Sequence, residues 1–514
     1  MSTTNIYILI SIAAYLALVL IIGIVCSKQN NTVDDFYLGG RKLGPLVTAM
    51  SAEASDMSSW LLMGLPGVAY LSGASEAVWT ALGLAVGTYL NWLIVSKRLR
   101  NYSQRIDAIT IPEFFSKRFG EKKNIIMALS AVIIIVFFVP YTASGFAACG
   151  KLFGTIFGID YHFAMVISAI VIVGYTTIGG FLAASTTDFM QSIVMTIALL
   201  TILGFGVYSA GGFANVIDNA SSLPGYLSLT SSYVASEGTS QSFGLLNIFS
   251  LLAWGLGYFG MPHILLRFMA IKDSKQLKTS RRVATVWVVI SLAVAVFIGF
   301  VGLAMTKSGA MESLADSETI IISIASLLAE NGAVFALIAG VILAGILAST
   351  MSTADSQLLT ASSGVSENII GGLLRIKTSK AMAMVIARVT LIIISVVAVI
   401  LAWDPNSSVF NIVSFAWAGF GASFGPIMLC SLFWKRTNKW GALSGMVAGG
   451  AMVFIWKYVI APIGVANESL AFLNIYELLP AFITGLAVTI IVSLITKKPD
   501  KEITDTFLEV KKMA

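Results

Sequence analysis

Charged residues are scarce in this chain of 514 residues: Asp, Glu, Lys and Arg make up 11% of it, whereas hydrophobic residues make up 57%. With a mean hydropathy of +0.88, the chain could not cover the surface of a soluble fold with so few charges. Histidine and cysteine are rarer still, with 2 and 3 residues. The scarcity of charge therefore predicts a polytopic membrane protein.

The cysteines exclude a disulfide framework. Cys26, Cys149 and Cys430 fall at or within apolar runs, and their odd number has no paired spacing, so we interpret them as buried thiols. The first apolar run lacks a basic leader and is followed by Lys28, which predicts a retained helix and not a cleaved signal peptide. The net charge of +6 comes without any motif for nucleic acid, and we expect no nucleic-acid partner.

Apolar runs long enough to cross a bilayer as a helix, about 20 residues, recur along the whole chain. They predict about thirteen spans. These lie near residues 6–26, 46–72, 76–95, 124–150, 161–178, 188–210, 244–266, 283–306, 331–364, 383–402, 408–434, 440–460 and 473–496.

Lys and Arg orient these spans, because short cytoplasmic loops hold the positive excess. If the N-terminus is outside, nearly all of the 32 Lys and Arg residues fall in cytoplasmic loops. Only Lys151, Lys307 and Lys457 fall on the other side, and Arg388 lies just inside a span. We therefore expect a multi-pass protein of the cell membrane, with the N-terminus outside and the C-terminus in the cytoplasm.

The second span carries an acid at bilayer depth. In Ser51–Gly67, SAEASDMSSWLLMGLPG, small residues surround Asp56. A charge there costs at least about 2.5–3.5 kcal/mol, so it persists mainly where it faces a cavity, a partner or an ion. Packing of small residues explains the Ala and Ser residues but not the acid. If the helix unwinds here, Ala54 and Met57 would offer main-chain carbonyls to a cation.

The seventh span is interrupted as well. Leu252–Pro262, LAWGLGYFGMP, holds three glycines and a proline, enough to break a helix at mid-depth. Two interrupted spans, five helices apart, predict an inverted repeat with the binding site between the broken helices. Trp254, Tyr258 and Met261 are spaced i, i+4 and i+7, which turns them to one side of any helical portion. They are either part of the site or ordinary core packing.

These features predict a division of the chain into six parts. They are an extra N-terminal helix (1–35), a first five-helix repeat broken near 54–59 (36–210), a mobile polar extracellular loop (211–243), a second, inverted five-helix repeat broken near 255–262 (244–434), two extra helices (435–496) and a cytoplasmic tail (497–514).

The ninth span supplies a face of hydroxyls. Its members stand at i, i+3, i+4 and i+7 and are flanked by Asp355: Ser349, Ser352, Thr353 and Ser356. Helix-internal Ser and Thr often bond only to the preceding turn, but four on one face beside an acid exceed that need. Hydroxyl, carbonyl and carboxylate oxygens bind hard cations, and the small negative charge favours a monovalent ion over calcium.

Two further residues have two interpretations each. Asp188 follows a Gly-Gly turn and two threonines, so it is either an ion ligand or a helix cap. Tyr141 follows Pro140 and either lines the transport path or satisfies a neighbouring backbone group.

Four motifs in this order resemble the sodium/solute symporter family, and most closely its proline-carrying branch. They are LGGRKLGPLVTAMSAEASDMSSWLLMGLPG, GYTTIGGFLAASTTDFMQ, LLAWGLGYFGMPHILLRF and ILASTMSTADSQLL. The resemblance covers nearly the whole chain. It implies an all-α membrane protein with the leucine-transporter fold, a five-plus-five inverted repeat with extra outer helices. It also implies alternating access, uptake of a small zwitterion (L-proline) driven by one or two sodium ions, no organic cofactor, and a functional monomer.

The resemblance also assigns residues. The sodium ligands would be the carbonyls of Ala54 and Met57 together with Ser349, Ser352 and Thr353, and the positions needed for coupled uptake would be Asp56 and Ser58. A second sodium, held by some relatives, would use Asp188, Asp355 and Ser356 in addition to Ser352. The solute would meet Ser59, Trp60, Tyr141, Trp254, Tyr258, Met261 and Pro262. The chain departs from the family pattern at Glu53, Ser59 and Met261, where we expect Gly, Gly and Gln, and at Asp355, where we expect an uncharged residue.

Three other functions are open to the sequence. The same fold with sodium coupling could carry another amino acid, pantothenate or a sugar. A channel is disfavoured because no pore-like ring or filter sequence is visible. An intramembrane enzyme would need two of the aspartates to meet, and no GxGD element accompanies them.

Overall fold

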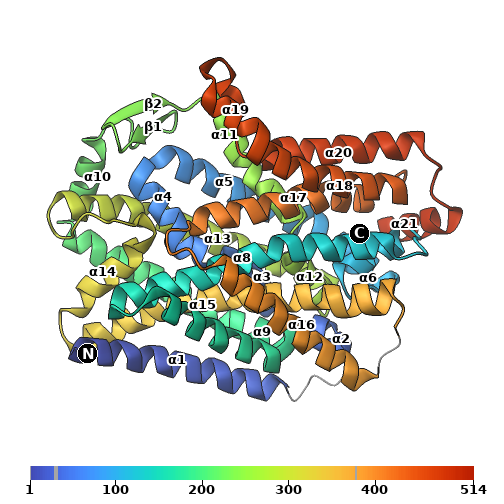
Figure 1. Ribbon diagram of the computed structural model, residues 1–514, viewed down its shortest axis with the longest axis horizontal. Helices are drawn as coiled ribbons and strands as arrows, with labels where there is room; N and C mark the ends of the chain where they lie inside the picture. The colour runs from blue at the N-terminus through green and yellow to red at the C-terminus, as the bar shows by residue number, and fades with distance from the viewer. Residues whose placement is uncertain (1, 28–32, 377–378, 514) are drawn as a thin grey trace.

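The computed structural model describes residues 2–27, 33–376 and 379–513. Helices make up most of this part, and the long ones run roughly along the longest axis of the molecule (Figure 1). The N-terminus lies at one end of that axis and the C-terminus toward the other.

The elements of the first half are listed in chain order. They are α1 (Thr3–Ser27), α2 (Val33–Leu38), η1 (Gly39–Arg41), α3 (Pro45–Ser59), η2 (Trp60–Gly64), α4 (Leu65–Ser72), α5 (Ala74–Leu90), η3 (Asn91–Val95), α6 (Ser96–Arg105), α7 (Ile111–Arg118), α8 (Ile125–Phe157), α9 (Tyr161–Ser209), α10 (Phe213–Ser221), β1 (Ser231–Val234) and β2 (Thr239–Ser242).

The second half continues with helices and short helical turns. They are α11 (Leu245–Leu252), η4 (Ala253–Phe259), α12 (Pro262–Ala270), η5 (Ser274–Gln276), α13 (Leu277–Lys307), η6 (Ser317–Thr319), α14 (Ile320–Ala329), α15 (Ala333–Ser363), η7 (Gly364–Leu373), α16 (Lys380–Leu401), α17 (Val409–Phe433), α18 (Lys439–Ile455), η8 (Trp456–Ile460), α19 (Ala461–Ala466), η9 (Glu468–Leu473), α20 (Leu478–Ile495) and α21 (Lys501–Met513).

The predicted spans coincide with helices. Among the described residues 10 helices are long and apolar enough to cross a membrane, and up to 11 if the bent pair Leu245–Phe259 and Pro262–Ala270 counts as one span. The remaining two predicted spans are helical but do not meet that measure by themselves. Tyr161–Thr177 is shorter, and the segment from α3 to α4 is interrupted at Ser58.

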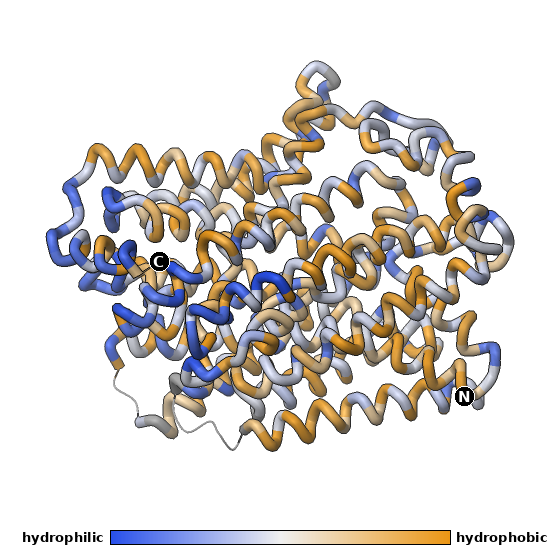
Figure 2. The backbone as a smooth tube through the Cα atoms, turned by 180° about the vertical axis from the view of Figure 1, so that it is seen from behind, coloured by the Kyte–Doolittle hydropathy of each residue, from blue (hydrophilic) through white to orange (hydrophobic). Residues whose placement is uncertain are grey.

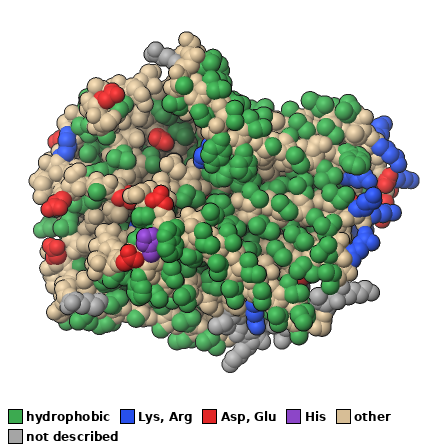
Figure 3. Space-filling model, viewed as in Figure 1, with side chains coloured by type: hydrophobic (Ala, Val, Ile, Leu, Met, Phe, Trp, Pro, Cys, Tyr) green, Lys and Arg blue, Asp and Glu red, His purple; other side chains and the backbone are tan. Residues whose placement is uncertain are grey.

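Apolar side chains form a belt around the bundle. Ile21 on α1, Ile170 on α9 and Ile400 on α16 are 59%, 62% and 63% exposed, and Figures 2 and 3 show hydrophobic residues over most of the sides. Such a surface is stable against hydrocarbon and not against water. The belt therefore marks the part of the molecule that lies in the bilayer.

Lys and Arg gather at one end of the bundle, which we call the basic end. In Figure 3 they lie at the end where the C-terminus is found, beyond the apolar belt. The C-terminal helix α21 packs on α6 at this end: Phe507 and Val510 are buried, and Arg105 pairs with Glu509 at 2.9 Å. The predicted tail is therefore in large part an amphipathic helix docked on the bundle.

The polar segment 211–243 differs from the loop that the sequence predicts. It holds helix α10 and the antiparallel hairpin β1–β2, which stand out at the end away from the basic end in Figure 1. Tyr226 anchors it, because its hydroxyl donates to the carbonyl oxygens of Ala69 (2.6 Å) and Tyr70 (3.0 Å). Polar composition predicted a mobile loop, whereas the structure has a helix and a hairpin here and joins them to α4 through Tyr226.

Three of the long helical segments are interrupted. In α3 the break falls at Ser58, with φ 49° and ψ −169°. Between α11 and α12 the chain passes through the 3₁₀ turn η4 and bends by 45° before Pro262. In α9 the break falls at Gly180, with φ 67° and ψ −173°. The first two breaks face each other across the core and define the site.

Candidate functional site

The break in α3 leaves backbone carbonyls without helical partners, as at any helix end. Ser58 adopts a positive φ, which costs a non-glycine residue on the order of 1–3 kcal/mol. Two hydroxyls from other helices stabilise this conformation by donating hydrogen bonds to the freed carbonyls. Ser352 Oγ of α15 donates to Ala54 O at 2.8 Å, and Tyr141 Oη of α8 donates to Asp56 O at 3.0 Å.

The hydroxyl face of α15 completes this group of oxygens. Ser352 Oγ and Thr353 Oγ1 each lie 3.1 Å from Ser349 O. The hydroxyl of Ser349 itself donates to Ile346 O, so this residue offers its carbonyl to the group. We call Ala54 O, Ser349 O, Ser352 Oγ and Thr353 Oγ1 the neutral site.

The fifth predicted ligand, Met57 O, lies one turn further along α3, where it accepts a hydrogen bond from the backbone N–H of Trp60. The neutral site contains carbonyl and hydroxyl oxygens only. Among the described residues no group of three or more His, Cys, Asp or Glu side chains is placed to hold a metal ion. Uncharged oxygens suit an alkali cation better than a divalent metal.

Asp56 lies on the other side of the same break. Its Oδ2 accepts a hydrogen bond of 2.6 Å from Tyr258 Oη of η4. Its Oδ1 is buried and has no hydrogen-bond partner among the described residues. A buried carboxylate oxygen without a donor is unfavourable, so this atom is placed to receive a donor from a bound molecule.

Close backbone contacts bring Tyr258 to Asp56. A Cβ on Gly87 of α5 would collide with the backbone of Gly255, and one on Gly257 would collide with the indole of Trp417. These glycines let η4 pack directly on α5 and α17. Asn91 of η3 then donates to Tyr258 O at 3.1 Å.

The broken helices enclose a small central cavity. It is lined by Asp56, Met57, Trp60, Leu84, Tyr141, Trp254, Val413 and Trp417. Its volume is about 10 Å³, room for no more than one water molecule. Ser58 and Ser59 lie next to it and line a second small void with Tyr141 and Thr353. A solute could enter only if side chains moved apart.

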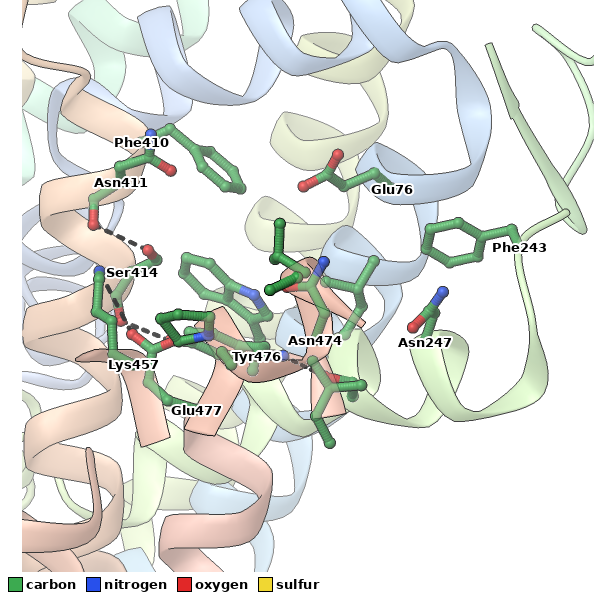
Figure 4. Close-up of a pocket in the computed structure, with 18 residues that line it drawn as sticks. Glu76, Phe243, Asn247, Phe410, Asn411, Ser414, Lys457, Asn474, Tyr476 and Glu477 are labelled. Carbon is green, nitrogen blue, oxygen red and sulfur yellow. Dashed lines mark hydrogen bonds and ion pairs between the residues drawn. The ribbon is translucent and has the colours of Figure 1, made fainter. Parts of the chain in front are cut away.

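Aromatic rings close the cavity on the side away from the basic end. The ring centroids of Trp60 and Trp254 lie 5.4 Å apart, and Phe410 of α17 lies 5.8 Å from the first and 5.6 Å from the second. Beyond Trp254 and Phe410 a much larger cavity of about 690 Å³ opens (Figure 4). The three rings therefore separate a closed inner space from an open outer one.

Two predicted solute contacts lie elsewhere. Met261 is fully buried at the start of α12 and does not line the central cavity. The sequence prediction placed it beside Trp254 by α-helical spacing, and the 3₁₀ turn η4 between them does not keep that spacing. Pro262 lines a separate small space together with Thr110 and Pro112.

Sequence reasoning missed the apolar wall of the cavity. Leu84, Val413 and Trp417 line it, yet nothing in their residue types distinguishes them from ordinary core. The glycine-rich run around Trp417, FAWAGFGASFG, was the available signal, because close helix packing brings its indole to Trp254, whose carbonyl it bonds at 2.8 Å.

The acids predicted for a second cation surround an arginine. Arg267 of α12 is 1% exposed. Its Nη2 lies 3.1 Å from Asp188 Oδ2 and 2.5 Å from Ser356 Oγ, and its Nε lies 3.0 Å from Ser51 Oγ. Asp355 lies beside this pair, and one of its oxygens accepts from Ser356. We call these five residues the charged cluster.

The surroundings of Asp188 exclude one of its two interpretations, the helix cap. The residue lies well inside α9, and its carboxylate bonds to side chains of α3 and α12, so it does not cap a helix start. Asp188 Oδ1 and Asp355 Oδ2 keep no partner among the described residues. Arg267 itself was not predicted, because a basic residue near a span end usually marks topology.

Glu53 is also buried. Its Oε1 accepts a hydrogen bond of 2.8 Å from Trp92 Nε1 of η3, and it stands one turn before Asp56 on α3. The structure thus places two acids on the same side of the break, each with one hydrogen-bond donor.

Comparisons with known proteins agree with one another. A family model described as the sodium:solute symporter family matches residues 36–449. The chain is 41% identical, over 95% of its length and 93% of the relative's, to a protein of Staphylococcus aureus (strain USA300 / TCH1516) named sodium/proline symporter. A protein of the same name from strain JH9 matches with the same identity and coverage.

Solved structures show the same fold. A sodium-coupled sialic acid symporter, solved in a substrate-bound outward-open state, matches 96% of this chain and 99% of its own, with a TM-score of 0.78 and 17% identity. Mhp1, a nucleobase-cation-symport-1 family transporter solved in a closed conformation with bromovinylhydantoin bound, matches 93% of this chain and 95% of its own, with a TM-score of 0.52 and 16% identity.

Proposed function

The chain belongs to the sodium:solute symporter family, and on this premise we propose that it imports L-proline together with sodium by alternating access. It has the leucine-transporter fold and is a multi-pass, sodium-coupled membrane transporter, not an enzyme. Proline is the proposed solute because relatives 41% identical over nearly the whole length are named sodium/proline symporters.

We propose that the basic end faces the cytoplasm. The excess of Lys and Arg at that end supports this orientation. The N-terminus then lies outside and α21 inside. The 690 Å³ cavity opens to the outside, and we refer to its end of the molecule as the outer end.

We propose that sodium binds at the neutral site. The hydrogen bond from Ser352 Oγ to Ala54 O joins α15 to the broken end of α3 at a point where both partners can also ligate a cation. The hydroxyls of Ser352 and Thr353 now donate to carbonyls of this site. When sodium enters, the hydroxyl and carbonyl oxygens would turn their lone pairs toward the ion, with Met57 O as a fifth ligand. Sodium would then hold the two helices together and favour the state that binds solute.

We propose that the solute binds in the central cavity. Asp56 Oδ1 is the atom that would accept a hydrogen bond from the protonated amine of a zwitterion. The solute carboxylate would meet backbone N–H groups at the helix break near Ser59. The aliphatic ring would lie between Trp60 and Trp254, which must separate because the cavity now has room for about one water molecule.

We propose a stoichiometry of one sodium per solute. A further ion at Asp188, Asp355 and Ser356 would share these oxygens with the guanidinium of Arg267, which already bonds to two of the three residues. One sodium moving through an inside-negative potential of 100 mV supplies about 2.3 kcal/mol, which equals nearly a fiftyfold accumulation of an electroneutral solute.

Uptake by purified protein in liposomes tests the proposal. Inward gradients of sodium, lithium and protons are imposed one at a time, and accumulation of labelled L-proline is measured against liposomes without protein. We expect concentrative uptake with the sodium gradient, and a charge movement of one per proline. Equal uptake with a proton gradient in sodium-free buffer would contradict the coupling.

The second candidate keeps the fold and sodium coupling but carries another small solute. Glu53 and Ser59 next to the site, where the family pattern has glycines, favour this alternative because they reduce the space near the break. An excess of other amino acids, pantothenate and sugars is added to the same liposomes. Inhibition by one of them at lower concentration than by unlabelled proline would identify it as the preferred solute.

A further inference from the structure

Three arginines gather where α17 ends, at the basic end of the molecule. Arg118 of α7 donates from Nε to Ser431 O at 2.8 Å. Arg98 of α6 donates from Nη1 to Leu432 O at 2.9 Å. Arg436, in the turn that follows α17, donates from Nη2 to two carbonyls at the end of α20. We call these three arginines the arginine group.

Capping of helix ends accounts for only part of what the arginine group can do. The last carbonyls of a helix lack partners inside it, and basic side chains commonly bond to them. A guanidinium has five N–H donors, however, and Nη1 and Nη2 of Arg118 and Nη1 of Arg436 are buried without a hydrogen-bond partner among the described residues. No carboxylate in the described part of the chain forms an ion pair with any of the three arginines. The group therefore has buried donors and positive charge but no anion.

The arginine group lies at the level of the membrane surface. Three helices that are long and apolar enough to cross a membrane have their ends at or near it: Ala74–Arg105, Val409–Phe433 and Leu478–Ile495. Phe433 and Trp440 are 41% and 52% exposed, and exposed aromatic residues at the ends of spans are typical of the lipid–water interface. Arg98 lies over the ring of Phe433, 4.4 Å from its centroid. Phospholipid headgroups are therefore the anions nearest to the group.

The C-terminal helix α21 covers Arg118. The ring centroid of Phe507 lies 5.1 Å from the guanidinium carbon, and those of Tyr102 and Phe119 lie at 5.4 and 5.2 Å. Arg118 is 1% exposed in this arrangement. Contacts between a cation and aromatic rings compensate the buried charge in part, but they give the N–H donors of Nη1 and Nη2 no oxygen acceptor. Departure of α21 would uncover these donors.

Few contacts hold α21 on the bundle. Its buried side chains are Phe507 and Val510. Its ion pair, between Glu509 and Arg105, joins side chains that are 54% and 50% exposed, so water and salt weaken it. An amphipathic helix with so small an interface can leave when a better partner for Arg118 is present.

We propose that the arginine group binds the phosphate of an anionic phospholipid and that this lipid displaces α21 from Arg118. A phosphate accepts paired N–H groups of a guanidinium in a bidentate manner, which would satisfy the donors that have no partner while α21 is docked. An anionic headgroup also brings the negative charge that the group lacks, whereas phosphatidylcholine adds a positive charge beside its phosphate. Through this exchange α21 would respond to the anionic lipid content of the membrane.

Accessibility of α21 tests the proposal. The full chain carrying Val510→Cys is placed in nanodiscs of phosphatidylcholine, with or without phosphatidylglycerol, and is labelled with a water-soluble maleimide. The introduced thiol is buried while α21 is docked, and the three native cysteines are buried as well. We expect phosphatidylglycerol to speed labelling at least about fivefold. Inorganic phosphate in phosphatidylcholine nanodiscs, at matched ionic strength, should leave the rate within about twofold; equal acceleration by phosphate would overturn the assignment to a lipid.

Charge variants locate the effect. In the chain with Val510→Cys, Arg118→Gln and Arg436→Gln should each remove the acceleration by phosphatidylglycerol. Arg282→Gln, at an exposed arginine, is the matched control and should keep it. Acceleration that is absent without these charge substitutions, or that persists in Arg118→Gln, would contradict the proposal.

Direct lipid binding covers the case in which Arg118→Gln releases α21 by itself. Native mass spectrometry measures phosphatidylglycerol and phosphatidylcholine bound to the full chain in detergent. Phe507→Ala uncovers Arg118 and should raise phosphatidylglycerol binding at least about threefold, whereas Leu508→Ala, on the exposed face of the same helix, should not. Phe507→Ala/Arg118→Gln should lose this gain. Equal gains for both lipids, no gain, or a gain that remains in the double variant would overturn the proposal.

Discussion

The neutral site and the charged cluster are neighbouring groups that both include hydroxyls of α15, one helical turn apart. In the neutral site, Ser352 and Thr353 meet backbone carbonyls and no charged side chain. In the charged cluster, Ser356 meets Arg267, which also pairs with Asp188. Both groups are buried and both join α15 to α3, yet only one of them already contains a positive charge.

This difference indicates which group is suited to a transported ion. Hydroxyl and carbonyl oxygens bind an alkali cation moderately and can bond to one another when it leaves, so the empty state costs little. A buried carboxylate pair without its arginine would have no such alternative, because unpaired buried charges are strongly unfavourable. We therefore propose that the neutral site exchanges the transported ion and that the charged cluster holds four helices together.

The largest effect is expected from Arg267→Gln. It leaves Asp188 and Asp355 without their positive partner, and breaking a buried pair on one side costs about 3–5 kcal/mol. The thermal unfolding midpoint of the purified protein in detergent should fall sharply, and Arg267→Gln/Asp188→Asn should recover part of the loss. Arg282→Gln, at an exposed arginine, is the control. An unchanged unfolding midpoint in Arg267→Gln would contradict the structural role of the charged cluster, and with it the distinction from the neutral site.

A smaller but more specific effect is expected from Ser352→Ala/Thr353→Ala. Loss of two ligands should raise the sodium concentration for half-maximal proline uptake at least about tenfold, since each hydrogen-bonding oxygen contributes about 1 kcal/mol. Thr360→Ala is matched to it: that hydroxyl is buried on the same helix but bonds only to Ser356 O, at 2.7 Å. If sodium dependence is the same in both variants, the neutral site is not the sodium site.

The smallest effect is expected from Asp355→Asn. The charge of Asp355 lies one turn from Ser352, but Arg267 opposes its field, so the sodium requirement should rise only roughly threefold. The ratio of charge to proline in liposomes, measured by current, should stay at one. A fall in that ratio from two to one on this substitution would instead assign a second ion to the charged cluster and make the two groups alike.

Much of the fold could be predicted from composition and pattern. Apolar runs predicted the helices, and the excess of Lys and Arg predicted a basic end, because the bilayer imposes length and charge rules on every span separately. The interruptions could be predicted too, since Ser and Gly runs within an apolar segment weaken the helix wherever they occur. Structure in 211–243 could not, because contacts of Tyr226 with α4 are not encoded in local composition.

Residues of the candidate site could be predicted where their side chains are energetically unfavourable inside a membrane. Asp56 and the hydroxyls of α15 stood out for that reason, and in the structure Ser352 Oγ donates a hydrogen bond to Ala54 O. Apolar residues such as Trp417 carried no such signal, and Met261 was placed by a helical spacing that η4 does not keep.

By itself, then, the amino-acid sequence determined that this chain is a bundle of membrane helices with polar breaks in two of its spans, because hydropathy and backbone hydrogen bonding act locally along each span. Only the tertiary structure decided that Arg267 belongs to Asp188 and that Trp254 separates two cavities. Both depend on which helices pack together over long sequence distances, and that choice is made by the shapes of all the packed side chains at once.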